Sequence, residues 1–216
     1  MTLTNIVLKI ISGAGATFLI FSTTLIFSLP LGLVIAFARM SKNVILKGTS
    51  STLISILRGT PLMLQLIVWC FGPYYIFGIT LKPSWRILSV IVGFSINYAA
   101  YFAEIYRAGI QSIPIGQYEA ANVLGYDKYQ TFVKIILPQM VKRVIPPVTN
   151  EVITLIKDTS LAFVVSYTEM FTIAKQVASK ESNVLALFIA GLFYYIFNYI
   201  VAFLMEKLEK RFDYYR

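Results

Sequence analysis

The chain has 216 residues, of which 57% are hydrophobic and only 13% are charged, and its net charge is +9. Soluble domains carry roughly 25% charged residues, so this composition excludes a disordered chain and disfavours a soluble enzyme. One cysteine, Cys70, and no histidine exclude an internal disulfide, a cysteine metal cluster and histidine-based catalysis. The sequence predicts an all-α integral membrane protein without catalytic residues, a metal site or a cofactor of its own. In such a chain the positive charge indicates topology and anionic headgroups, not nucleic-acid binding.

Runs without charge mark most of the predicted membrane spans, at residues 10–38, 59–81, 87–103 and 182–205. About 20 mainly apolar residues are needed to cross the hydrocarbon core. The apolar stretch 144–167 contains Glu151, Lys157 and Asp158, and we interpret it as a further span that carries functional charges. We therefore expect one transmembrane domain over residues 1–216, with five spans at about 14–39, 53–77, 86–106, 141–166 and 184–206.

Positive charge is divided unevenly between the two sides of these spans. One side holds 12 cations: Arg39, Lys42, Lys47, Arg107, Lys128, Lys134, Lys142, Arg143, Lys207, Lys210, Arg211 and Arg216. The other side holds five: Lys9, Lys82, Arg86, Lys175 and Lys180. Because Lys and Arg concentrate in cytoplasmic loops, we expect the N-terminus outside and the C-terminus in the cytoplasm. The long loop 107–140 is then cytoplasmic, and loops of this length are commonly functional.

A short helix is predicted within this loop at about 117–124. Gly125 suits the position after its last turn, where a positive φ is needed. Ala120 and Ala121 give the helix a surface of small side chains that another protein can approach closely. A short helix with a stop at both ends is suited to pass motion from a cytoplasmic partner to the membrane helices, and the alternative is a surface helix without a partner.

The same loop carries the most specific sequence pattern. Glu119-Ala120-Ala121, followed by Gly125 and by Ile135-x-Leu137-Pro138, resembles the EAA loop of the membrane subunits of bacterial ABC importers. Three further segments narrow the resemblance to the polar-amino-acid permeases, of the histidine, arginine, lysine and glutamine type: Arg58-Gly59-Thr60-Pro61, the segment 103–117, and Lys157-Asp158-Thr159-Ser160-Leu161. Ala108 departs from the family pattern, which usually has a second glycine there.

The resemblance implies the permease fold of ABC type I importers in a bacterial plasma membrane. It also implies a second permease subunit, two cytoplasmic ATPase subunits, an extracellular or periplasmic solute-binding protein and an alternating-access mechanism. Whether the permease pair is a homodimer or a heterodimer stays open. The chain has no G-x-x-x-x-G-K-[ST] motif, so ATP and Mg would be used by the partner subunits. The helix 117–125 would dock on the ATPase, with Glu119, Asp127 and Lys128 as charged contacts.

Polar side chains of the third and fourth spans are the candidates for a substrate pathway. By helical spacing Asn97, Tyr101 and Glu104 share one face, with Tyr98 beside them. Asp158 and Thr159 of the next span complete the predicted pathway. Glu104 and Asp158 would favour a cationic side chain, as in arginine, histidine or lysine. Arg58 is expected to pair with an acid near the cytoplasmic end.

Several alternatives stay open at this point. The intramembrane acids can instead lock helices together, and the substrate can be glutamine, glutamate or another polar amino acid. An ion-gradient-driven carrier fits less well, because we find no internal repeat. A non-transporting membrane scaffold would need neither the acids nor the loop motif. Gly13, Gly15, Gly32 and Gly93 are predicted to allow close helix approach.

Overall fold

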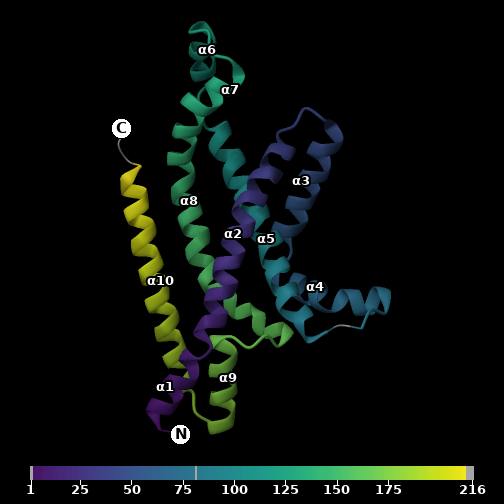
Figure 1. Cartoon of the computed structure of the whole chain (residues 1–216), viewed down its shortest axis with the longest axis vertical. Coiled ribbons are helices and arrows are strands. Elements are labelled where there is room, and N and C mark those ends of the chain that lie inside the picture. Colours follow the sequence, from purple (N-terminus) through teal and green to yellow (C-terminus); the bar gives the residue numbers. More distant parts are fainter. Residues whose placement is uncertain (1, 81, 213–216) are drawn as a thin grey trace.

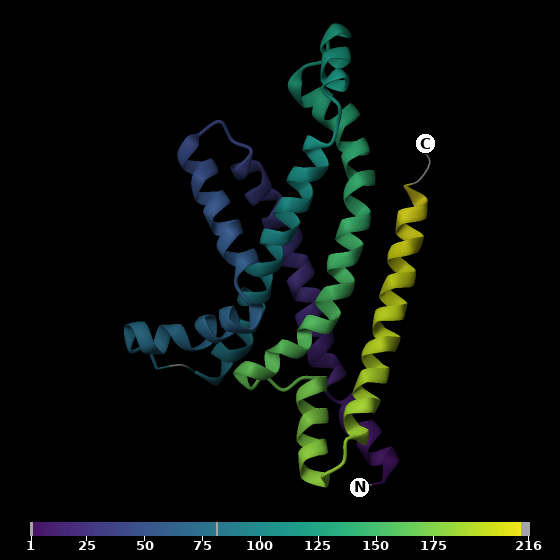
Figure 2. The same ribbon diagram turned by 180° about the vertical axis from the view of Figure 1, so that it is seen from behind.

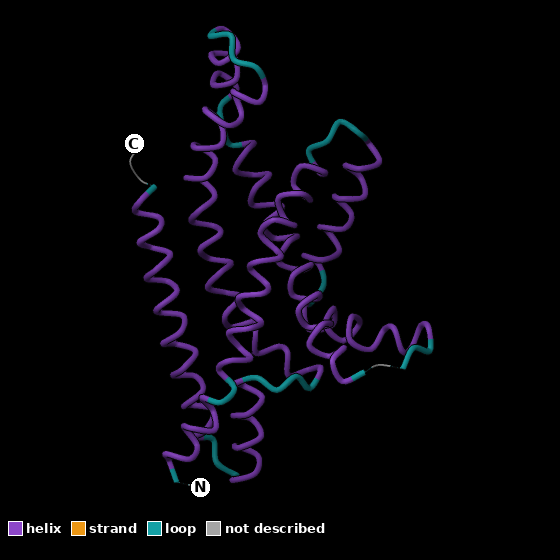
Figure 3. Tube along the Cα trace, in the orientation of Figure 1, coloured by secondary structure: helices purple, strands orange, loops and turns teal. Residues whose placement is uncertain are grey.

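The computed structural model describes residues 2–80 and 82–212, and every regular element in that part is helical. The tube in Figure 3 shows long helices joined by short loops. In chain order the elements are α1 (Leu3–Ile11), α2 (Ala14–Arg39), α3 (Val44–Gly59), α4 (Leu62–Phe77), α5 (Pro83–Gln111), α6 (Ile115–Val123), α7 (Lys128–Thr131), the π-helical turn η1 (Phe132–Ile136), α8 (Leu137–Asp158), the 3₁₀ segment η2 (Thr159–Val165), α9 (Met170–Glu181) and α10 (Leu185–Arg211).

Four long helices, α2, α5, α8 and α10, run along the long axis of the molecule (Figures 1 and 2). The short helices α6 and α7 cap one end, which we call the α6 end. At the opposite end, the α9 end, lie α1, α9 and the start of α10. The side chains of Phe94, Phe102, Leu155 and Ile156 are fully buried and belong to the main apolar core, which α5 and α8 share. This arrangement confirms the all-helical prediction.

The membrane spans differ from the predicted set. Within the described residues, three helical segments are long and apolar enough to cross a membrane: Leu3–Arg39, Pro83–Gln111 and Leu185–Arg211. A fourth candidate, α3 with α4, passes only as a pair that is bent by 108°. The count of five spans is therefore not confirmed in the described part of the chain, and the predicted span 53–77 falls on two helices, α3 and α4, that meet at this bend.

The bend follows from the local sequence. Thr60 has an extended backbone (φ −116°, ψ 146°), as is expected for the residue before a proline, and Pro61 lacks the amide hydrogen that would continue the helix. The Gln65 amide donates to Leu57 O at 2.8 Å and to Thr60 O at 3.1 Å. Asn97 Nδ2 of α5 donates to the same Leu57 oxygen at 3.1 Å. Side-chain amides thus satisfy the carbonyls that the break leaves free, and they fasten the bend to α5.

Other boundaries also moved. Helices α2 and α10 coincide with the first and last predicted spans, although α10 continues to Arg211. The predicted span 141–166 is α8 followed by η2. The predicted loop 107–140 is largely helical, because it contains α6, α7 and η1 and because α5 reaches Gln111 and α8 begins at Leu137. Helix α9 was not predicted, because its 12 residues mix buried apolar and exposed polar positions and are too short for a span.

Three of the four glycines named above sit at close contacts. A Cβ on Gly13, Gly32 or Gly93 would lie less than 3.0 Å from atoms of another helix. At Gly15 nothing lies within 4 Å of that position, so the prediction for Gly15 is wrong. Whether a glycine allows close helix approach depends on which residue of another helix lies opposite it, and local sequence does not reveal that residue.

Candidate functional site

A cavity of about 390 Å³ opens between α3, α5 and α8. Its charged and aromatic lining comes from Arg58 of α3, Tyr101 and Glu104 of α5, and Arg143 and Glu151 of α8. Charged residues inside an apolar helical protein are energetically unfavourable unless they pair or contact a cavity. Two carboxylates and two guanidiniums facing one space therefore mark this cavity as the candidate pathway.

Glu104 lines the cavity, but its charge is already compensated. The Arg107 guanidinium donates to Glu104 Oε1 through Nε at 3.0 Å and also through Nη2. Arg39 Nε of α2 lies 3.4 Å from Glu104 Oε2. Two cations thus surround this acid, and the Arg39 contact ties α2 to α5. The contacts of Glu104 thus include a link between two helices.

Arg58 does not form the predicted ion pair. Within the described residues, no carboxylate lies within salt-bridge distance of its guanidinium. The guanidinium instead lies over the ring of Tyr101, 5.2 Å from the ring centroid. A cation over an aromatic face keeps its N–H donors available. Arg58 therefore presents free donors to the cavity.

Tyr98 and Asp158 form a direct link between α5 and α8. The Tyr98 hydroxyl donates to Asp158 Oδ2 at 2.7 Å, and Tyr98 is only 2% exposed. Asp158 is half-buried and lies seven residues after Glu151 on α8. Residues seven apart share a helix face about 10 Å apart, so the two acids follow one track from the cavity toward the α9 end.

Two other predicted pathway residues face packing contacts. Asn97 is 3% exposed, and its amide also donates to Gln65 Oε1 at 3.0 Å in the bend described above. Thr159 is fully buried, and its hydroxyl donates to Ile156 O at 2.7 Å. The structure brings Tyr101 and Glu104 to the cavity and places Asp158 beyond it, but it holds Asn97 and Thr159 within the protein.

One buried acid was missed from the sequence. Glu169 is fully buried and accepts hydrogen bonds from the backbone of Phe171 and Thr172, both at 2.7 Å, and from the Tyr194 hydroxyl at 2.8 Å. Thr17 Oγ1 of α2 lies 3.4 Å away. An acid directly before a segment with helical periodicity is a helix-start signal. Interpreting Glu169 as the N-cap of a helix that begins at Met170 would have identified this residue.

The segment between α5 and α8, which we call the tip (residues 112–136), is ordered by its own contacts. Gly125 has φ +76° and follows Leu124, the cap of α6, as predicted. Asp127 caps α7 in a reciprocal pair with Gln130, so this acid is engaged locally. Lys134 Nζ lies 5.5 Å from the centroid of the Tyr126 ring.

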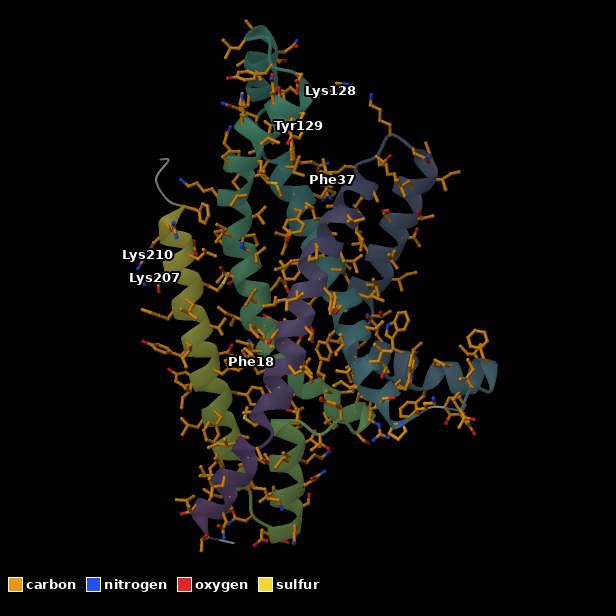
Figure 4. All side chains as sticks on the ribbon, viewed as in Figure 1. Phe18, Phe37, Lys128, Tyr129, Lys207 and Lys210 are labelled. Carbon is orange, nitrogen blue, oxygen red and sulfur yellow. The ribbon has the colours of Figure 1, made fainter. Side chains whose placement is uncertain are left out.

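Only part of the predicted contact surface is accessible. Ala121 is fully buried, so the interpretation of Ala121 as an outer small-residue surface is wrong, whereas Glu119, Ala120 and Lys128 are exposed. Sequence reasoning missed the large apolar side chains that the tip exposes: Ile115, Val123, Leu124 and Tyr129, each at least 71% exposed. Figure 4 shows Tyr129 and Lys128 at this end of the molecule.

Burial raises the pKa of the Tyr118 phenol of α6 above its ordinary value.

No cluster of three or more His, Cys, Asp or Glu side chains that could hold a metal ion occurs in the part of the chain that the structure describes. The cavity lining supplies carboxylates, guanidiniums and the phenol of Tyr101. Such a set can bind a zwitterion by pairing each of its charges with an opposite one.

Comparisons with known proteins give the same picture. A model of the family described as "Binding-protein-dependent transport system inner membrane component" matches residues 28–214. The "L-cystine transport system permease protein TcyB" of Bacillus subtilis (strain 168) is 38% identical over 192 residues, which cover 88% of this chain and 80% of that protein. The "Probable amino-acid ABC transporter permease protein YckA" of the same organism is 37% identical over 207 residues, 95% of this chain and 90% of that protein.

A solved structure, "Crystal structure of an amino acid ABC transporter with histidines", contains a chain that superimposes with a TM-score of 0.87 at 28% identity. The match covers 98% of this chain and 100% of that one. The chain thus belongs to the family of binding-protein-dependent transport system inner membrane components, within its amino-acid ABC transporter permeases, and has the ABC type I importer permease fold.

Proposed function

We propose that this chain forms the membrane pathway of an importer that moves amino acids into the cytoplasm by alternating access. Two separate ATPase subunits would hydrolyse Mg-ATP, a second permease subunit would complete the pathway, and an external solute-binding protein would deliver the cargo. One observation carries the proposal. The exposed tip is inserted between α5 and α8, and these are the two helices that supply most of the cavity lining.

This connection provides a mechanism for coupling. The apolar side chains of the tip offer an ATPase subunit a hydrophobic contact, with Glu119 and Lys128 as polar neighbours. When ATP binding moves the ATPase subunits, the tip would move with them, and α5 and α8 would follow because they continue directly into it. ATP needs a higher affinity for one of the two states to drive the cycle.

The orientation follows from the charge distribution. In the structure, Lys128, Lys207 and Lys210 lie toward the α6 end (Figure 4), and the N-terminal helix lies at the α9 end. Positive residues favour the cytoplasmic side. We therefore place the α6 end in the cytoplasm and the α9 end outside the cell.

For the substrate, the cavity supports recognition of the zwitterion that all amino acids share. The free donors of Arg58 suit the carboxylate, and Glu151 suits the ammonium group. A cationic side chain would meet Asp158 farther along α8, so we propose basic amino acids as the preferred substrates. Glu104 contributes less to this preference because two arginines already compensate its charge. The names of the relatives mention cystine and histidines, and a polar neutral substrate is the second candidate.

The test compares uptake of labelled arginine and glutamine by the complex reconstituted in vesicles. We expect Asp158→Asn to lower arginine uptake about tenfold more than glutamine uptake, since removing one close charge in a low-dielectric site removes more than ~1 kcal/mol of attraction. Glu151→Gln should lower both uptakes to a similar extent, because its carboxylate serves the ammonium group that both substrates share. Glu206→Gln, on the exposed end of α10, is the matched control and leaves both rates unchanged.

A purely structural role for Asp158 would make Asp158→Asn lower both uptakes equally, and this result would remove Asp158 from the specificity site. Uptake by the permease without any ATPase subunit would contradict the importer mechanism itself.

A further inference from the structure

A second cavity lies between α8 and α10, near the C-terminal end of α10. This cavity, the α8–α10 cavity, has a volume of about 380 Å³. Among the described residues, its charged lining consists of two lysines and two glutamates: Lys142 of α8, and Glu206, Glu209 and Lys210 of α10. Because these charges balance, the lining suits a ligand that itself carries a charge of each sign.

The α8–α10 cavity is separate from the candidate pathway. Helix α8 lines it with Lys142, Ile145 and Pro146, which share one face of the helix by their spacing. The α8 residues that line the candidate pathway lie on another face: Arg143, Pro147 and Glu151. The two cavities therefore lie on different sides of α8, and a ligand in the α8–α10 cavity does not occupy the candidate pathway of this chain.

The position of the cavity along α10 places it at the level of lipid headgroups. Helix α10 is long and apolar enough to cross a membrane, and Glu206 is the first charged residue after the uncharged run 182–205. About 20 mainly apolar residues cross the hydrocarbon core, so the residues from Glu206 onward lie where that core ends. Helix α10 also lies on the side of the molecule opposite α3 and α4 (Figures 1 and 2). Its last apolar turns expose Ile200, Phe203 and Leu204, a surface suited to acyl chains.

The carboxylate of Glu209 is available to a cationic group. Glu209 is half-buried, and among the described residues no cation lies within salt-bridge distance of its side chain. The other acid of the cavity is already paired, because Glu206 Oε1 lies 2.6 Å from Lys210 Nζ. A half-buried carboxylate without a counter-charge favours a ligand that brings an ammonium group.

The lysines supply the opposite charge beside it. A lysine ammonium carries several N–H donors, so Lys210 can bind a second acceptor while it remains paired with Glu206. Lys142 reaches the cavity from the facing helix and is half-buried. The cavity thus offers ammonium groups to an anion and, in Glu209, a carboxylate to a cation.

We infer that the α8–α10 cavity binds the headgroup of a phosphatidylethanolamine molecule from the surrounding bilayer. Its ammonium group donates to Glu209, and its phosphate accepts from Lys142 and Lys210. The apolar part of the lining, Ile145, Pro146 and Phe212, contacts the glycerol and the first methylene groups of the lipid.

The other common headgroups fit this lining less well. Phosphatidylglycerol has no cation, so it leaves Glu209 without a counter-charge. Phosphatidylcholine has a quaternary ammonium group, which has no N–H to donate to a carboxylate. The inference depends only on α10 lying in a membrane and is independent of the proposed function.

The experiment uses the full chain, purified in detergent with the subunits that co-purify with it and then depleted of lipid. It is titrated with phosphatidylethanolamine, phosphatidylcholine and phosphatidylglycerol of identical acyl chains, and native mass spectrometry measures the bound lipid. We expect the wild type to bind phosphatidylethanolamine about fivefold more tightly than the other two, because one further charge-assisted contact at a partly exposed site has a modest effect. Soluble glycerophosphoethanolamine, which lacks the acyl chains, should not displace the lipid at equal concentration.

Two variants separate the two halves of the headgroup. Glu209→Gln should abolish the preference for phosphatidylethanolamine over phosphatidylcholine and leave the affinity for phosphatidylcholine unchanged. Lys210→Gln should weaken the binding of both lipids to the same extent, because both carry the phosphate.

Glu206→Gln is the matched control, because it makes the same charge change in the same cavity at a carboxylate that is already paired with Lys210. It should keep the preference of the wild type. Thermal unfolding in lipid-free detergent should be the same for all variants, so a folding defect is recognised directly.

Equal binding of the three lipids to the wild type would overturn the inference, and so would a preference that survives Glu209→Gln. Tighter binding of phosphatidylglycerol would overturn it as well, because the cavity would then be a site for anionic lipid. Displacement by glycerophosphoethanolamine would show a site for a soluble ligand instead. None of these results concerns amino-acid uptake, so the proposed function stands or fails separately.

Discussion

The two ends of the molecule are both built from short helices, but they are stabilised in opposite ways. At the α9 end, the buried carboxylate of Glu169 connects α9 to α10 and lies within hydrogen-bond distance of Thr17 in α2. At the α6 end, the tip is ordered by local contacts such as the Asp127 cap and Gly125, and it exposes apolar side chains. The α9 end is thus anchored to distant helices of its own chain, whereas the tip is ordered locally and leaves large apolar side chains exposed.

The largest expected effect concerns the anchor. Glu169→Ala should lower the free energy of unfolding by about 3 kcal/mol, because it leaves buried donors of Thr172 and Tyr194 without an acceptor. Thermal unfolding of the protein in detergent measures the loss. Glu206→Ala, at an exposed carboxylate of α10, should leave the transition unchanged. A transition that is equally unaffected by Glu169→Ala would show that this acid does not anchor the α9 end.

A smaller effect is expected at the junction of α2 and α9. Gly13→Ala should destabilise the protein by about 2 kcal/mol, because the added Cβ would lie 2.8 Å from the backbone of Met170. Gly15→Ala, two residues later in the first turn of α2, is the matched control, with open space around the new methyl group. Denaturant unfolding should separate the two variants, and equal stabilities would argue against a tight α9 end.

At the tip we expect a loss of binding without a loss of stability. Val123→Asp should weaken association with the ATPase subunits about tenfold, equivalent to about 1.4 kcal/mol, because it places a charge in the apolar contact. Val184→Asp makes the same change at an exposed site of the α9 end. Co-purification and titration of the ATPase subunit measure the difference, and normal association of Val123→Asp would exclude this surface as the contact.

The smallest effect is local. Gly125→Ala should destabilise the turn between α6 and α7 by about 1 kcal/mol, because a residue with a Cβ is strained at φ +76°. Gly116→Ala, in an unstrained backbone with open space, is the control. Hydrogen exchange of residues 115–131 should rise in the first variant only. An unchanged exchange rate there would mean that the tip is held by more than its local contacts.

Much of the fold and the tip followed from patterns within a few residues. Helices α2 and α10 were visible as long uncharged runs, and the turn at Gly125 was visible because a glycine after a short helix has a local conformational reason. The bend at Pro61 was equally local, but hydropathy alone joined α3 and α4 into one span. Reading the proline as a helix break would have corrected this prediction.

For the candidate site, the residue types can be predicted from the sequence but their partners cannot. The types are recognisable, since acids and arginines within apolar segments indicate function. Their partners were not, because the contact of Arg39 with Glu104 and that of Tyr98 with Asp158 span 65 and 60 positions of the chain. The hydrogen bonds of Asn97 to Leu57 and Gln65 are equally distant in sequence. The sequence therefore predicts Asn97 in the pathway, whereas in the structure its amide stabilises the bend between α3 and α4.

By itself, the sequence determined the membrane class, the family resemblance and the existence of a short capped helix between two long ones, since these depend on composition and on neighbours within one or two helical turns. Only the tertiary structure decided which charges are free and which are neutralised. A carboxylate such as Glu104 or Glu169 can bind a ligand or lock helices, and the choice depends on the donors that distant segments bring within about 3 Å of its oxygens.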